Sequence, residues 1–159
     1  MNFPYSEVIA LMERLHRRSL DVIKLELDAH CVDDVTGVQA MILFNMGDLE
    51  MAIGELMYRG CYLGANLSHN VKKLLANGYI VQERSSRDRR TVRVRLSEKG
   101  LALRQKLNHM YERHMSLLSQ GTIQAEDMVA ANRTLRRLDR FWIQDVDLGR
   151  RAKTFPSAA

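Results

Sequence analysis

The sequence predicts a mainly α-helical fold that carries a small β-sheet of two or three strands. Its two prolines, Pro4 and Pro156, stand near the two ends of the chain, so no proline interrupts a helix between them. Apolar residues recur every three or four positions through most of the chain, which is the period of an amphipathic α-helix. An alternating apolar and charged pattern occurs at Thr91–Leu96, which indicates a β-strand.

Length and composition are those of an ordinary globular protein, and we expect a single domain over residues 1–159. The chain has no run of about 18 apolar residues and no signal-peptide pattern at its N-terminus. We therefore expect no membrane contact and a cytoplasmic location. Cys31 and Cys61 form no cluster with each other or with histidines, so we expect neither a metal site nor a cofactor.

A long first helix is expected over residues 5–30. Apolar side chains spaced three or four positions apart line one side of it: Ile9, Met12, His16, Leu20, Ile23 and Leu27. Two short apolar helices are expected next, at 38–44 with Thr36 as the N-cap and at 52–58 with Gly60 at the end.

A fourth helix is predicted to end at Gly78, because glycine readily adopts the left-handed conformation that terminates a helix. Its buried face consists of Leu67, Val71, Leu74 and Leu75. Strands at 80–84 and 91–96 should then pair as a hairpin.

Ser97 has the position of an N-cap for a fifth helix, and a sixth helix follows a linker at 119–122. The fifth helix has an apolar stripe made of Leu103, Leu107, Met110, His114 and Leu117. The sixth has one made of Met128, Ala131, Leu135, Leu138, Trp142 and Val146. Residues 36–97 are too few to cover all these faces, so we expect 5–30 and 98–147 to be dimerisation helices. The alternative is that they pack on each other within one chain.

Positive charge is concentrated in the middle of the chain. The 24 basic and 19 acidic residues give a net charge of +5. Between Arg59 and Arg104 there are 11 basic and 3 acidic residues, a net +8, so the rest of the chain sums to −3. A localised basic patch indicates a polyanionic partner. With a short helix beside a basic hairpin, it predicts a winged helix-turn-helix over residues 36–97 that binds double-stranded DNA.

The exposed front of the fourth helix contains the candidates for direct contact with DNA. They are Ala65, Asn66, Ser68, His69, Lys72 and Lys73. Asn66 can pair with adenine and Lys72 can reach guanine, which makes both candidates for base readout. Ala65 is small enough to approach a thymine methyl, whereas Ser68 and Lys73 could equally contact phosphates. Any single member could instead be a solvated side chain, so the prediction rests on the set.

The hairpin loop adds further cations to this surface. Arg84, Arg87, Arg89 and Arg90 are the candidates for DNA contact there. Asp88 is expected to pair with one of these arginines and to shape the loop. A remaining arginine can then enter an adjacent minor groove, where a narrow A·T stretch concentrates negative potential.

The order of elements and two sequence segments resemble the MarR family of winged-helix regulators, over about residues 5–147. The segments are Asp88-Arg89-Arg90 with Leu96-Ser97-Glu98-Lys99-Gly100 after it, and Leu67 to Leu74 followed by Gly78. The resemblance implies a homodimer on an inverted-repeat operator, usually a repressor, often relieved by a small aromatic ligand or by oxidation. It also implies Arg90 or Arg89 as the residue that enters the minor groove.

A small apolar or aromatic effector would bind where the first, second and fifth helices approach the winged helix. The candidates are His16, Leu20, Met41, Phe44, Leu107 and Tyr111, and the alternative is that they form a closed core. Cys31 and Cys61 are expected to be small buried residues, with a redox-sensing role as the alternative. The sequence has no phosphate loop, nucleophile elbow or metal-spaced cluster, so we do not expect an enzyme. A dimeric protein-interaction module with weak DNA binding remains the other alternative.

Overall fold

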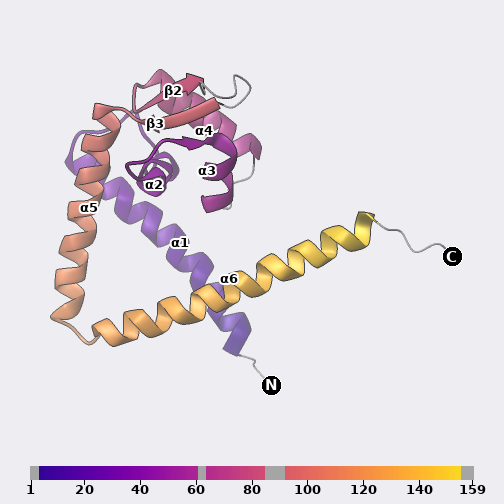
Figure 1. Cartoon of the computed structure of the whole chain (residues 1–159). Coiled ribbons are helices and arrows are strands. Elements are labelled where there is room, and N and C mark those ends of the chain that lie inside the picture. Colours follow the sequence, from indigo (N-terminus) through magenta and orange to yellow (C-terminus); the bar gives the residue numbers. More distant parts are fainter. Residues whose placement is uncertain (1–3, 61–63, 85–91, 155–159) are drawn as a thin grey trace. The chain divides into compact units, whose positions relative to one another are not determined.

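The computed structural model describes residues 4–60, 64–84 and 92–154, and side chains within these ranges except at 64, 65, 84 and 147–154. Six helices and three strands occur in the described ranges (Figure 1). The helices are α1 (Pro4–Ala29), α2 (Gly37–Met46), α3 (Ile53–Gly60), α4 (Gly64–Ala76), α5 (Glu98–Ser119) and α6 (Ala125–Thr154). The strands are β1 (Met51–Ala52), β2 (Ile80–Arg84) and β3 (Val92–Leu96). The predicted mainly helical fold with a small sheet is confirmed.

The chain forms two compact units, Met1–Tyr111 and Glu112–Ala159. The first holds α1 to α4, the sheet and most of α5. Its core is a single cluster of apolar side chains from all of these elements, with Ile23, Leu43, Leu56, Leu74, Val94 and Leu107 among its members. The predicted buried face of the fourth helix is confirmed at Leu67, Val71 and Leu74, and Leu75 is half-buried against the same core.

The sheet is antiparallel, with β3 between β1 and β2. In the β2–β3 hairpin, Ile80 lies opposite Leu96 and Gln82 lies opposite Val94. The two-residue strand β1 adds to the other edge of β3, where Met51 pairs with Val94. We expected residues 52–58 to be helical from the start. Ala52 belongs instead to β1, and α3 begins one residue later, because Met51 buries its side chain against the sheet before the chain turns.

Helix ends follow the expected capping chemistry. Thr36 caps α2: its hydroxyl accepts a hydrogen bond from the Gln39 backbone N–H, and the Gln39 side chain accepts one from the Thr36 backbone N–H. Gly78 has a φ of +75° directly after α4, which confirms the predicted left-handed stop.

The two long stripes are buried only next to the small module. In α1 the buried residues are Ile23 and Leu27, whereas His16 is exposed. In α5 burial stops at Met110, and Leu117 is 65% exposed. The other residues of these stripes, Ile9, Met12, Leu20 and His114, are half-buried.

Cys31 is exposed and has a left-handed φ of +53°, so the expectation that it is a small buried residue is wrong. It follows the last turn of α1, where its backbone N–H still bonds to the carbonyl of Asp28 while the chain reverses. Cys61 lies outside the described residues.

The second unit consists of the end of α5 and α6. Among the described side chains of α6, at 125–146, none is buried, and Leu138 and Trp142 are half-buried. Six large apolar side chains on this helix are exposed: Met128, Val129, Leu135, Phe141, Ile143 and Val146. In the parts of the chain that the structure describes, no helix has the length and apolar character needed to cross a membrane.

Candidate nucleic-acid interface

Helix α4 has one apolar and one polar face. Leu67, Val71 and Leu74 are buried in the core, with exposed fractions of 1%, 3% and 0%. The predicted contact residues Asn66, Ser68, His69, Lys72 and Lys73 are all exposed. The side chain of Ala65 lies outside the described part of the structure. The sequence therefore placed the outward-facing residues of this helix correctly wherever the structure describes them.

Asn70 lies in the same polar stretch but is directed at the protein. Its side-chain oxygen accepts a hydrogen bond from Nε2 of Gln39 at 3.1 Å, and its Nδ2 donates to the backbone carbonyl of Asn66 at 2.9 Å. Gln39 is 6% exposed and is also the residue that completes the cap of α2. A chain of side-chain amides thus links the first turn of α2 to the first turn of α4.

The wing strands contain two arginines that are already paired within the protein. Nε of Arg93 lies 2.6 Å from Oε1 of Glu50, and an Nη of Arg95 lies 3.0 Å from Oε1 of Glu83. The β2–β3 hairpin is described as far as the pairing of Arg84 with Val92. Arg87, Asp88, Arg89 and Arg90 lie outside the described residues, as does the side chain of Arg84.

Other basic residues of the central patch are also paired within the protein. Arg59 pairs with Glu55 at 2.9 Å, Lys99 with Asp34 at 2.8 Å, and Arg104 with Asp48 at 2.5 Å. Among the basic side chains described between residues 59 and 104, only Lys72 and Lys73 have no ion pair with another described residue. The charge available to a polyanion in this part is thus located on α4, next to the predicted wing.

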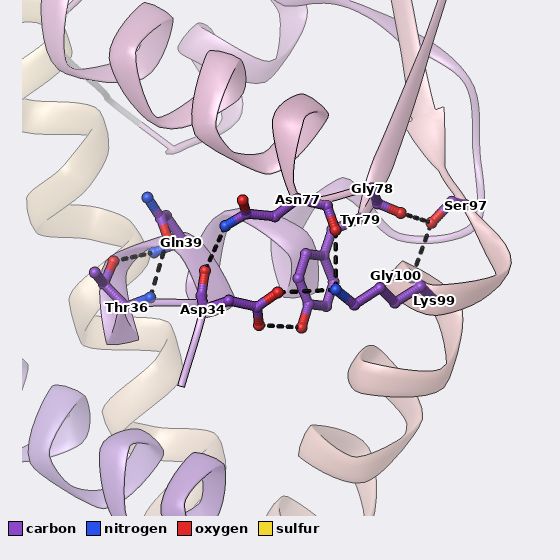
Figure 2. A network of polar contacts seen from close by, with 9 residues as sticks. All are labelled: Asp34, Thr36, Gln39, Asn77, Gly78, Tyr79, Ser97, Lys99 and Gly100. Atoms are coloured by element: carbon purple, nitrogen blue, oxygen red, sulfur yellow. Dashed lines mark hydrogen bonds and ion pairs between the residues drawn. The ribbon is translucent and has the colours of Figure 1, made fainter. Parts of the chain in front are cut away.

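A polar network anchors the turn between α4 and β2 (Figure 2). Asp34, in the segment between α1 and α2, accepts hydrogen bonds from the Tyr79 hydroxyl at 2.6 Å and from Nζ of Lys99 at 2.8 Å. The Asp34 backbone carbonyl accepts a bond from Nδ2 of Asn77 at 2.6 Å. Lys99 also donates to the Asn77 carbonyl at 2.9 Å, and its Nζ lies 4.0 Å from the centre of the Tyr79 ring.

The contacts in this network shift the pKa of three side chains. Burial alone would raise the pKa of Asp34, but hydrogen bonds from Lys99 and Tyr79, with the Lys99 charge, hold it below its usual value. The bond to Asp34 is the main cause that raises the pKa of Lys99. Burial and the neighbouring Asp34 carboxylate raise the pKa of Tyr79. Near neutral pH, Asp34 and Lys99 are therefore charged and Tyr79 keeps its proton.

The predicted N-cap of the fifth helix joins the same region. The Ser97 hydroxyl accepts a bond from the Gly100 N–H at 3.1 Å and donates to the Gly78 carbonyl at 2.6 Å. The Ser97 backbone N–H donates to the Tyr79 carbonyl at 3.0 Å. The first turn of α5 is thus tied directly to the end of the helix that presents Lys72 and Lys73.

The structure brings some of the effector candidates together. The rings of Phe44 and Tyr111 have centroids 4.9 Å apart at an angle of 58°, and burial raises the pKa of Tyr111. Met41 packs half-buried against the core and Leu107 is fully buried, while Leu20 on α1 is half-buried. His16 is exposed and is not brought into this apolar group by any contact that the structure describes.

Sequence reasoning missed four residues that hold the interface in place: Gln39, Asn70, Asp34 and Tyr79. Gln39 was missed because it lies within an apolar helix, although its position three residues after Thr36 is the sign of a capping box. Asp34 was missed because its partners are 45 and 65 residues away, and no local pattern reports such contacts.

Comparisons with known proteins agree with this geometry. A model of the winged helix DNA-binding domain matches residues 35–100, close to the predicted module at 36–97. A relative from Rhizobium meliloti (strain 1021), the exopolysaccharide II synthesis transcriptional activator ExpG, is 38% identical over 138 residues. That alignment covers 87% of this chain and 71% of the relative.

Two solved structures have the same fold. FabT from Streptococcus pneumoniae, determined in complex with DNA, superposes with a TM-score of 0.71 at 17% identity and covers 89% of this chain and 99% of its own. A MarR transcriptional regulator from Methanosarcina mazei Go1 superposes with a TM-score of 0.69 at 17% identity and covers 90% of this chain and 99% of its own. The likeness extends over α1, the sheet and the later helices, and is not confined to the small module.

Proposed function

Because the chain belongs to the MarR family of winged helix-turn-helix transcriptional regulators, we propose that it binds an inverted-repeat operator as a homodimer, with α4 in the major groove. One observation carries this proposal above the others. The exposed face of α4 presents Asn66, His69 and Lys72, while Lys72 and Lys73 keep charges that no described acidic residue neutralises. The phosphates of a DNA duplex would neutralise these lysines if α4 lay in a groove.

Base contacts are assigned to Asn66 and Lys72, with Ala65 near a thymine methyl. Amide and ammonium groups at the front of a recognition helix can read adenine and guanine edges. Ser68, His69 and Lys73 are assigned to phosphates or to neighbouring base edges. This division predicts that changes at Asn66 alter sequence preference, whereas changes at Lys73 weaken binding to all sequences alike.

The wing is assigned to an adjacent minor groove. Arg84, Arg87, Arg89 and Arg90 supply its charge, and Asp88 organises the loop by pairing with one of them. The pairing of Arg93 with Glu50 and of Arg95 with Glu83 supports this assignment indirectly, since it leaves the arginines of the loop as the candidates in the hairpin for contact with DNA.

The homodimer is supported by the apolar surface left on the long helices. Leu15 and Leu25 on α1 are 53% and 69% exposed, and Met115 and Leu117 on α5 are 67% and 65% exposed. Exposed apolar faces of this extent indicate an interaction surface. Light scattering at micromolar concentration should give twice the 18.3 kDa chain mass. A stable species at the chain mass would contradict the dimer.

The direction of regulation is proposed from the relative. We expected repression from the family resemblance, but the relative that is 38% identical is a transcriptional activator. We therefore propose activation at the principal target promoter. A promoter fusion compared with and without the intact gene decides this, since higher expression without the gene would indicate a repressor.

A small aromatic effector remains part of the proposal. The walls of the effector's binding site would be Met41, Phe44 and Tyr111, with Leu20 and Leu107 behind them. His16 would take part only if its exposed side chain turned toward this group. Binding can weaken DNA contact only if the effector prefers a state in which the two α4 helices are wrongly spaced. Aromatic acids and phenols that raise the melting temperature should also reduce operator affinity. A compound that raises the melting temperature of the protein without changing its affinity for the operator would contradict the effector proposal.

The test of DNA binding is selection of bound fragments from the host genome, followed by sequencing. The parent should enrich sites that share an inverted repeat. The double variant Arg89→Ala/Arg90→Ala should enrich them weakly at low salt, because lost cation contacts reduce the affinity for the backbone. Enrichment of random fragments by the parent would favour the interaction-module alternative. A change in binding on oxidation, absent in Cys31→Ser or in Cys61→Ser, would favour redox sensing.

A further inference from the structure

Three elements of the first unit meet at a single carboxylate. Asp34 lies between α1 and α2, Tyr79 lies in the turn between α4 and β2, and Lys99 lies in the first turn of α5 (Figure 2). The Asp34 carboxylate binds the other two side chains through different oxygens, Oδ1 to Tyr79 and Oδ2 to Lys99. One side chain therefore connects the segment between α1 and α2, the turn that follows the recognition helix, and α5.

The turn after α4 is held from both sides. Asn77 donates to the Asp34 carbonyl and accepts from Lys99, at 2.6 and 2.9 Å. The Gly78 carbonyl accepts from the Ser97 hydroxyl at 2.6 Å. The turn after α4 thus has bonded partners both in the segment between α1 and α2 and at the start of α5.

The network gives little stability for its size. The side chains of Asp34 and Lys99 are 38% and 50% exposed, and ion pairs exposed to this extent contribute little to the free energy of folding because water screens them. The core cluster already holds Tyr79, which is 3% exposed. Beyond packing, the three residues supply orientation. The two oxygens of the Asp34 carboxylate accept hydrogen bonds from Tyr79 and Lys99, which fixes the orientation of the two segments that carry these side chains.

We propose that Asp34, Tyr79 and Lys99 are positioning residues that fix the angle of α4 and the wing relative to α1 and α5. This rests on the proposed function as a homodimer on an inverted repeat. If α1 and α5 contact the second copy, that angle sets the separation of the two recognition helices. Half-sites on a duplex must match this separation, at about one helical turn or a multiple of it. The network therefore determines which half-site spacing the dimer accepts.

The test measures binding as a function of spacing. The probes are duplexes that carry the inverted repeat selected by the parent from a random-sequence pool, with one or two base pairs added or removed at the centre. The parent should bind the selected spacing best. Asp34→Asn and Lys99→Met should lose about five- to tenfold in affinity at that spacing and much less at the altered spacings, so the preference flattens. Tyr79→Phe, which keeps the ring, should flatten it less.

Two matched controls separate positioning from other effects. Asp28→Asn makes the same chemical change in another lysine pair, with Lys24 on α1, and should keep the parent's spacing profile. Lys72→Ala removes a proposed DNA contact and should lower affinity by a similar factor at every spacing. Thermal melting curves recorded by circular dichroism show whether each variant is folded. If Asp34→Asn does not fold, Tyr79→Phe takes its place in the test.

The outcomes distinguish this inference from the function it rests on. If folded Asp34→Asn, Lys99→Met and Tyr79→Phe keep the parent's spacing profile, or lose affinity equally at every spacing, the positioning role is wrong while the function stands. If the parent itself shows no preference for an inverted repeat at any spacing, the proposed function fails, and the positioning role fails with it.

Discussion

A Cβ atom placed on Gly100 would lie 2.1 Å from the carbonyl oxygen of Tyr79. The same oxygen accepts a hydrogen bond from the backbone N–H of Ser97 at 3.0 Å, so the start of α5 rests directly on the turn that precedes β2. No side chain fits between two backbone segments this close. The glycine that ends the Leu-Ser-Glu-Lys-Gly segment is thus required by contact between backbones, and it lets the polar network around Asp34 form.

Replacing this glycine should destabilise the protein. Gly100→Ala should lower the free energy of unfolding by about 2 kcal/mol or more, because the clash is with backbone that cannot move without breaking the Ser97 bond. Chemical denaturation of the variant and the parent measures the difference. Gly54→Ala is the control, since a Cβ there meets nothing within 4 Å, and it should leave stability within about 0.5 kcal/mol of the parent or raise it. Equal stability of both variants would show that Gly100 and the Tyr79 carbonyl are not in this contact.

The contribution of Asp34 to stability should depend on pH. Its pKa in the folded protein is held below the ordinary value of 3.8, despite the opposing effect of burial, by bonds from Lys99 and Tyr79. A depressed pKa means that the contribution is complete above 3.8 and is lost as the pH falls through the folded value. The stability difference between the parent and Asp34→Asn, measured by urea denaturation, should therefore be constant between about pH 5 and pH 9, where both Asp34 and Lys99 are charged, and shrink toward pH 2.

Lys99 should give the opposite trend at high pH. Its pKa is raised above 10.5, chiefly by the bond to Asp34, so its contribution is complete below 10.5 and is lost as the pH rises through the folded value. Urea midpoints of the parent and Lys99→Met across this range measure the trend. A difference that stays the same at both extremes of pH would mean that the carboxylate and ammonium are not paired in solution.

Salt dependence should separate the cations that bind DNA from those that stabilise the fold. Lys73→Ala should reduce the slope of log affinity against log salt by about one unit, since this side chain is assigned to phosphates and has no ion pair with a described residue. Arg93→Met should leave the slope nearly unchanged, because Arg93 is occupied by Glu50. Fluorescence anisotropy on the selected operator at several salt concentrations gives both slopes. A larger loss of slope for Arg93→Met would reverse the assignment.

The amide link between α2 and α4 should matter for both stability and binding. Gln39→Leu removes the donor to Asn70 in a buried site and should cost about 1–3 kcal/mol of stability. The backbone amides in the first turn of α4 should then exchange hydrogen faster than in the parent. Operator binding should weaken as a consequence. Asn132→Ala, which removes a similar bond to Arg136 on an exposed helix face, should change neither. Unchanged exchange in Gln39→Leu would mean that the link does not hold α4.

Local patterns predicted most of the fold. The caps at Thr36 and Gly78 could be predicted because capping and left-handed termination depend on one or two residues. The buried face of α4 could be predicted because its apolar residues recur with the period of a helix. Strand β1 was not readable, since two residues contain no period and Met51 belongs to the sheet only through its contact with Val94.

The sequence predicted those site residues whose role depends on facing outward from a helix. It did not predict which side chains are paired by contacts between segments far apart in the sequence. Lys72 and Lys73 face outward as expected. Arg93 and Arg95 were counted with the basic patch, yet each is paired with a glutamate on a neighbouring segment, which only the strand register brings close. Cys31 was expected to be buried because most cysteines are, but it lies in the turn after α1 with a left-handed φ, and its side chain is exposed while the next residue, Val32, packs against the core.

Footprinting of the selected operator with hydroxyl radicals tests the central claim most directly. A dimer that places α4 of each copy in successive major grooves should protect two patches of backbone related by a two-fold axis, with their centres about 34–36 Å apart along the duplex. The protection flanking each patch should disappear with Arg89→Ala/Arg90→Ala, because the wing occupies the adjacent minor groove. A single protected patch, or uniform weak protection along the whole fragment, would contradict two-fold readout by the winged helices.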